Sequence, residues 1–210
     1  ASISRGFKSG GFQGQLSFDP GALVPFEDET LIAYEAGIKS RLAGNTLQLN
    51  AAVFFYDYSD LQFYGGLFDS PVGVLFGITN VGDAEVMGLE AELWWRASER
   101  MDIRLGLGLL DTEITRSVVD GVATGSELPN APDMTFNGQF RYQWPIAGNL
   151  KLEALIAANY QGDLTFDVVR DPPEAREKGY WLTDARLGIG AQDDRWNVSV
   201  WGRNLADERY

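Results

Sequence analysis

The amino-acid sequence predicts an all-β fold, an antiparallel transmembrane β-barrel of which this chain forms only part. Three observations support that prediction. Apolar and polar residues alternate with a period of two along most of the chain, as they do in strands. Tight turns alternate with long connections. Aromatic residues gather toward the predicted strand ends, where a membrane barrel carries its two aromatic girdles.

The alternation is clearest in four stretches, each with one apolar and one largely polar face. These are residues 89–96, 102–109, 134–144 and 196–203. Weaker alternation predicts four further strands, at residues 29–42, 46–58, 150–161 and 179–191. The opening residues 1–7 read as a ninth strand that is cut at its start. Residues 1–210 are therefore expected to form one domain of about nine strands, without an internal boundary.

The connections between the predicted strands differ in length in a regular way. Four are tight turns, at residues 43–45, 98–100, 145–148 and 193–194. Between them lie long connections, at residues 9–28, 63–76, 118–133 and 162–178. In bacterial outer-membrane barrels the short turns face the periplasm and the long loops face the exterior, so the same orientation is expected here.

Aromatic placement favours a membrane barrel over a soluble β-sandwich, whose strands also have one apolar face. One set lies near the short turns, at Trp94, Trp95, Trp144 and Trp196. A second set lies near the opposite strand ends, at Phe54, Phe55, Tyr56, Tyr58, Tyr160, Tyr180 and Trp181. Amphipathic rings favour the headgroup level of a bilayer, so the two sets predict two girdles. Short strands place many aromatics near an end in any fold, and the sandwich therefore stays an alternative.

Composition bounds the possible functions. The chain has 17 Lys and Arg against 30 Asp and Glu, and this net charge of −13 disfavours nucleic-acid binding. It contains no cysteine and no histidine, which removes disulfides, thiolate and imidazole metal ligands and a serine triad. The carboxylate pair Glu90 and Glu92 would suit a glycosidase, but the same spacing arises in any polar strand face. We expect neither an enzyme nor a cofactor or metal site.

The number of strands indicates a fragment of a larger barrel. In lipid every backbone N–H and C=O must be paired, which requires a closed sheet. About nine strands do not close in the even-numbered manner of bacterial barrels, and the chain begins inside a strand. Further strands are therefore expected outside this sequence.

Six segments resemble TonB-dependent outer-membrane receptors, and they follow the family's order. They are residues 4–12, 34–40, 49–58, 80–90, 128–132 and 204–210. The second reads Tyr-Glu-Ala-Gly-Ile-Lys-Ser, and the fourth begins Asn-Val-Gly-Asp-Ala-Glu and ends Gly-Leu-Glu. Each motif is weak alone, but together they cover nearly the whole chain.

This resemblance implies a barrel of about 22 strands with a plug inside, of which the chain would hold roughly the last ten without the final one. It implies a bacterial outer-membrane location and energised uptake of a scarce nutrient, with an iron–siderophore complex as the expected cargo. Cobalamin, carbohydrate and other metal chelates stay open. The implied partners are outer-membrane lipid, the cargo, and TonB, which would act through a plug domain absent from this chain.

Aromatic residues of the outer loops are the first candidates for ligand binding. They are Phe63, Tyr64, Phe68 and Phe76, which lie among glycines. Such a stretch can stack on an aromatic or sugar-like ligand, or it can simply cover the barrel mouth.

Lumen-facing arginines are the second candidates, namely Arg104, Arg141 and Arg186. They can guide an anionic ligand, brace the plug through salt bridges, or form a solvated wall whose charges balance across strands. Two further functions also stay open. One is a passive porin-like channel without a plug, and the other is a soluble β-sandwich binding module.

Overall fold

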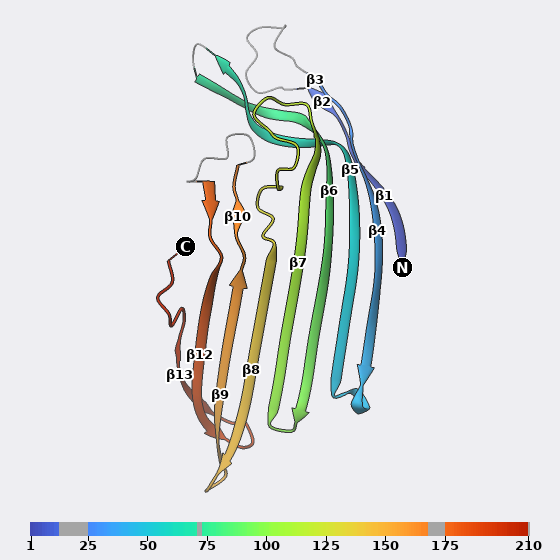
Figure 1. Ribbon diagram of the computed structural model, residues 1–210. Coiled ribbons are helices and arrows are strands. Elements are labelled where there is room, and N and C mark those ends of the chain that lie inside the picture. Colours follow the sequence, from blue (N-terminus) through green and yellow to red (C-terminus); the bar gives the residue numbers. More distant parts are fainter. Residues whose placement is uncertain (13–24, 71–72, 168–174, 210) are drawn as a thin grey trace.

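The computed structural model describes residues 1–12, 25–70, 73–167 and 175–209, with backbone only for residues 65–70 and 73–76. Nine strands form one antiparallel sheet in the order β1-β4-β5-β6-β7-β8-β9-β12-β13 (Figure 1). Their bounds are Ser2–Lys8, Glu29–Leu42, Leu47–Ser70, Gly73–Ser98, Met101–Ser117, Met134–Ile146, Leu150–Gln161, Tyr180–Ala191 and Asn197–Gly202, in that order. The predicted all-β fold is therefore confirmed, and the strands expected at residues 29–42 and 150–161 have the observed bounds.

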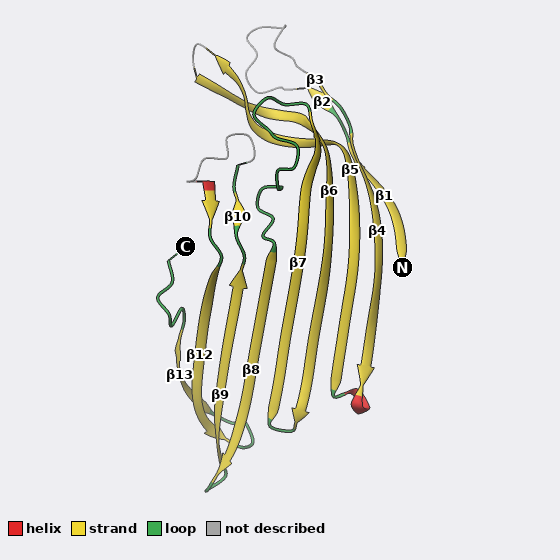
Figure 2. Cartoon of the chain, in the orientation of Figure 1, coloured by secondary structure: helices red, strands yellow, loops and turns green. Residues whose placement is uncertain are grey.

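The sheet is an open wall rather than a closed barrel. β1 and β13 are its two edges, and no pairing joins them within the described residues. Short pairs extend two external connections: β2 (Gly11–Phe12) with β3 (Pro25–Phe26), and β10 (Leu164–Thr165) with β11 (Arg176–Glu177). Figure 2 shows that strands dominate the chain, with the short 3-10 turn η2 (Ala43–Asn45) between β4 and β5. This is the predicted partial barrel.

Helices contribute almost nothing to the described structure. None of them is long and apolar enough to cross a bilayer, a finding that has no bearing on strands. The tight turns instead depend on residues that tolerate a left-handed backbone. Between β8 and β9, Gly148 and Asn149 have φ of 76° and 65°, which glycine and asparagine adopt at low cost.

One predicted connection is wrong. Residues 63–76 were expected to form a long loop, but β5 continues to Ser70 and β6 begins at Gly73. The ladder between these strands shifts register between Tyr58 and Leu61, between Leu61 and Gln62, and between Gly66 and Phe68. Each bulge changes which face the next side chain occupies, so the period of two disappears from the sequence while the pairing continues.

The apolar face forms a band of consistent height. On β5 it runs from Leu47 to Phe55, opposite an apolar row of β6 that ends at Met87. Beyond that height the same face carries Asp57, opposite Glu85. Eight steps of about 3.4 Å give about 27 Å along the strand, or about 21 Å at a tilt of about 40°. This height is close to the band of about 25 Å expected of an outer-membrane barrel.

No second layer of described residues covers this band. Val53, Ile156 and Val198 lie on the apolar face and are 51%, 52% and 64% exposed. Leu105 is 40% exposed. A sandwich would bury these side chains against a second sheet. The soluble two-layer alternative is therefore wrong, because the uncovered apolar face needs a lipid environment.

The girdle prediction is correct for about half of its residues. Ladder partners show that these aromatics lie on the apolar face: Trp95, Trp144, Trp196, Phe55, Tyr160 and Trp181. Others lie on the polar face and belong to no girdle: Trp94, Phe54, Tyr56, Tyr58 and Tyr180. Nearness to a strand end does not fix the face, because neighbouring residues point to opposite sides of a strand.

Candidate functional site

The polar face of the wall carries a belt of cations near the short turns. Ladder partners place seven basic residues on this face within about seven positions of a turn: Lys39, Arg41, Arg96, Arg104, Arg141, Lys151 and Arg186. The chain as a whole has a net charge of −13, so this local excess of positive charge departs from its average. An anionic group inside the barrel would be attracted to this end of the wall.

Arg104 is the most available of the three predicted arginines. Its guanidinium carbon lies 5.8 Å from the centre of the Trp94 ring, and Arg96 lies 5.7 Å from the same ring. No carboxylate of the described residues forms an ion pair with it. A hollow of about 450 Å³ opens beside it, lined also by Glu90, Glu92 and Trp94. Arg104 can therefore meet a ligand.

Arg141 belongs to the wall itself. It forms an ion pair with Asp102 of β7, and its Nη1 lies 3.6 Å from Oε2 of Glu153 on β9. Gln143 donates to the same Glu153 oxygen at 2.7 Å. These contacts tie three strands together across the polar face. The sequence left three roles open for Arg141, and these contacts fit the wall with charges balanced across strands most directly.

Arg186 has a weaker attachment at the edge of the sheet. Its Nη2 donates to Oδ1 of Asn197 at 3.0 Å, which joins β12 to β13. Nearby, Lys151 of β9 pairs with Asp194, in the turn between β12 and β13, at 2.6 Å. The structure thus places all three predicted arginines on the lumen face, but gives each a different set of contacts.

The predicted loop aromatics lie at the opposite end of the wall. Phe63 is partly buried and packs against the clusters of Leu61, Val81 and Ala84 and of Ile114 and Val122. Tyr64, the next residue, is 64% exposed. Phe68 and Phe76 lie on β5 and β6, but their side chains are outside the described residues. The structure therefore does not bring the aromatics together with the arginines.

An inner aromatic row was missed by the sequence analysis. Phe54 and Tyr56 lie on the lumen face of β5 with ring centres 4.8 Å apart. The Tyr56 hydroxyl donates to Glu35 of β4 at 2.9 Å. The signal was present, because these residues share their parity with Gln48 and Asn50, which mark the polar face of the strand.

Comparison with known proteins decides the family. Residues 1–205 match the family described as TonB dependent receptor-like, beta-barrel. The chain belongs to this family. Barrels of the family lie in the bacterial outer membrane. This location explains why the apolar band of the chain is not covered by protein. Outer-membrane lipid is therefore the environment of its outer face.

One curated relative and two solved structures are similar to the chain. The pesticin receptor of Yersinia enterocolitica is 29% identical over 99% of this chain. The ferric yersiniabactin uptake receptor FyuA from Yersinia pestis is 24% identical over 98% of the chain, with a TM-score of 0.73. The copper transporter OprC is 14% identical over 99% of the chain, with a TM-score of 0.68. The chain spans 29%, 29% and 31% of their respective lengths, so it corresponds to under a third of each.

Proposed function

We propose that this chain is part of the wall and external connections of an outer-membrane receptor that takes up a scarce nutrient with energy delivered through TonB. The match of residues 1–205 to the family is the observation that carries the proposal. The wall supports it physically, because it combines a lipid-facing apolar band with a polar, charged interior. The contact with TonB would be made by a plug domain encoded outside this sequence.

The proposed cargo is an iron–siderophore complex. FyuA, named for ferric yersiniabactin, supports this choice, whereas OprC, named for copper, shows that one fold serves different cargoes. This chain has no histidine or cysteine, the side chains that most often bind transition metals. A metal that arrives already chelated needs no such ligands. Its chelator can be held by aromatic and cationic side chains.

The predicted residues would divide this work by position. At the external end, Tyr64 has the exposed ring that could stack on a chelator, and Phe63 would support it from the packed layer below. Phe68 and Phe76 are proposed as further contacts on the same hairpin. Arg104 would attract an anionic cargo or an acidic protein surface in the lumen, whereas Arg141 and Arg186 would hold the wall in shape.

Uptake by the full-length receptor tests the proposal. Cells that depend on this receptor for iron would be given radioiron complexed with a panel of siderophores, with and without TonB. We expect accumulation of at least one complex, and its loss without TonB or after the proton gradient is collapsed. Passive flux of small sugars that is unaffected by either treatment would instead identify a porin-like channel. No catalytic step is proposed, because the family consists of receptors and transporters.

A further inference from the structure

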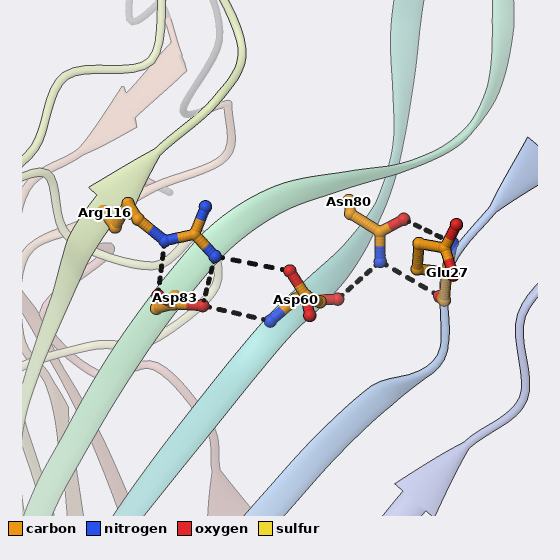
Figure 3. A network of polar contacts seen from close by, with 5 residues as sticks. All are labelled: Glu27, Asp60, Asn80, Asp83 and Arg116. Carbon is orange, nitrogen blue, oxygen red and sulfur yellow. Dashed lines mark hydrogen bonds and ion pairs between the residues drawn. The ribbon is translucent and has the colours of Figure 1, made fainter.

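A polar network lies just beyond the external edge of the apolar band. Its centre is the segment Asn80-Val81-Gly82-Asp83-Ala84, one of the motifs that the sequence analysis singled out and the proposed function leaves unexplained. Figure 3 shows five of its members, contributed by the segment between β3 and β4, by β5, by β6 and by β7. Above this level the outer halves of β5 and β6 bend and cross the end of the wall (Figure 1).

Asn80 of β6 joins two other segments through its side chain. Its Oδ1 accepts the backbone N–H of Glu27 at 2.7 Å, and its Nδ2 donates to the carbonyl of the same residue at 3.0 Å. Nδ2 also donates to the carbonyl of Asp60 on β5 at 2.6 Å. The amide thus continues the sheet where the backbone ladder between β4 and β5 has ended at Thr30 and Ser59.

Gln62 makes a second connection to the same place. It is 8% exposed, and its Nε2 donates to the carbonyls of Glu27 at 2.9 Å and of Lys8 and Ser9 at 3.3 Å. Its backbone N–H donates to the Glu29 carboxylate at 2.7 Å. The connection between β1 and β4 is therefore fixed to the β5–β6 hairpin by side-chain amides at both of its ends.

Arg116 connects the hairpin to β7. Its Nε and Nη2 donate to the two carboxylate oxygens of Asp83 at 2.5 Å and 2.8 Å, and Nη2 also lies 3.3 Å from Asp60. Asp83 in turn accepts the backbone N–H of Asp60 at 3.1 Å. The Arg116 guanidinium holds the pKa of the Asp83 carboxyl below its usual range, against the opposing effect of partial burial.

The backbone at this corner has a shape that ordinary strands lack. Asp60 has φ of 54° and Gly82 has φ of 132°. A Cβ at position 82 would overlap the carbonyl oxygen of Arg116, so only glycine fits there. The register shifts on both sides of β6 at this height, next to Leu61 and Ala84. Together these features turn the hairpin away from the line of the wall.

Apolar packing extends the junction to the connection between β7 and β8. Leu61, Val81 and Ala84 form a buried cluster against which Val119 and Leu128 pack. The backbone supports this contact, because the N–H of Val118 donates to the carbonyl of Val81 at 2.9 Å. One corner of β6 therefore touches three external connections that are far apart in the sequence.

We propose that Asn80 is a positioning residue that joins three external connections into one cooperative unit. These connections are β1–β4, the β5–β6 hairpin and β7–β8. The β1–β4 connection and the β7–β8 connection are each bonded to the β5–β6 hairpin at this corner, so the opening of either one loosens the hairpin and, through it, the other. The neutral amide bonds of Asn80 and Gln62 hold the β1–β4 side of this unit, and the Val118–Val81 backbone bond with the apolar cluster holds the β7–β8 side. The Arg116 ion pairs are about half exposed, so they contribute less and are screened by salt.

Hydrogen exchange of the full-length receptor in lipid nanodiscs tests the unit. The variants are Asn80→Ala, which removes all three amide bonds, and Asn80→Asp, which keeps the size but replaces the donor by a charged oxygen that faces the carbonyls of Glu27 and Asp60. We expect exchange about tenfold faster or more in residues 25–29, 60–64 and 118–130 alike, as the loss of one or two net hydrogen bonds predicts. Asn159→Asp, on the lumen face of β9 away from the corner, is the matched control and should leave all three segments unchanged.

The pattern of exchange, rather than its size, decides between a unit and a local contact. Faster exchange confined to the hairpin, with residues 118–130 unchanged in both Asn80 variants, would overturn the proposal. Arg116→Gln supplies an independent check. Its effect should be smaller than that of Asn80→Ala and should shrink further at high salt, whereas the effect of Asn80→Ala should not depend on salt. An equal or larger effect of Arg116→Gln at high salt would also contradict the proposal.

Discussion

Two neighbouring alanines on β5 provide a sharp test of which face meets lipid. Ala51 lies at the centre of the apolar band, opposite Ala91 and Ile38. Ala52 lies on the other face, opposite Glu90 and Gly37. The two residues have the same side chain and almost the same membrane depth. Arginine at each position therefore differs only in the environment that it enters.

The expected cost differs by several kcal/mol. An arginine facing lipid near the midplane destabilises a barrel by about 2–4 kcal/mol, so Ala51→Arg should lower the folding equilibrium constant by roughly 30-fold to 1,000-fold. Ala52→Arg should cost no more than about 1 kcal/mol. Its side chain enters water, has room beside Gly37 and lies across from the Glu90 carboxylate.

Denaturant titration of the full-length receptor in lipid vesicles measures this difference, with tryptophan fluorescence or gel mobility as the signal. We predict that the midpoint shifts clearly for Ala51→Arg and hardly at all for Ala52→Arg. Equal shifts, or a larger shift for Ala52→Arg, would refute the assignment of the two faces.

Three further predictions concern the corner and the polar wall. Gly82→Ala should prevent normal assembly of the external connections, because φ of 132° and the Arg116 carbonyl leave no place for a Cβ. We expect rapid proteolysis of the variant outside the membrane, and a resistance to protease equal to that of the wild type would contradict this. The Asp83 pKa is lowered in the folded protein, so its stabilising effect is present above the usual carboxyl pKa and is lost as pH falls through the lowered value. Exchange near the corner should therefore accelerate in acid, and Asp83→Asn should remove that pH dependence. Arg141→Ala should destabilise the wall by up to about 1 kcal/mol more than Arg104→Ala in the same denaturant assay, because it removes the ion pairs that join β8 to Asp102 and Glu153, whereas Arg104 has no such pair among the described residues.

The spanning part of the fold could be predicted from the sequence because lipid and water impose the alternation directly. Leu105 and Leu107 point outward, and Arg104 points inward, as their parity predicts. Nearness to a strand end carries no information about parity, and that explains the misplaced aromatics. Trp94 and Trp95 are neighbours near one rim, yet only Trp95 lies on the outer face. A girdle prediction that counts faces as well as strand ends would have separated them.

The external end could not be predicted in the same way. Above the band no solvent boundary enforces a period of two, and bulges beside Asp60 and Gly82 displace the pattern further. The contacts there join residues that are distant in the sequence, such as Asn80 and Glu27, which lie 53 positions apart. Such pairs leave no local signal in a single sequence. The packed position of Phe63 likewise depends on Val119 and Leu128 of another connection.

Accessibility along one strand tests the outward orientation of the apolar band most directly. The chain contains no cysteine, so single cysteines at each position from 47 to 55 can carry a spin label in the full-length receptor once any other cysteines are replaced. Labels at the odd positions, on the face of Ala51 and Val53, should collide mainly with oxygen dissolved in lipid. Labels at the even positions should collide mainly with a water-soluble nickel complex. A profile without this period of two, or with its phase reversed, would contradict a membrane barrel built in this way.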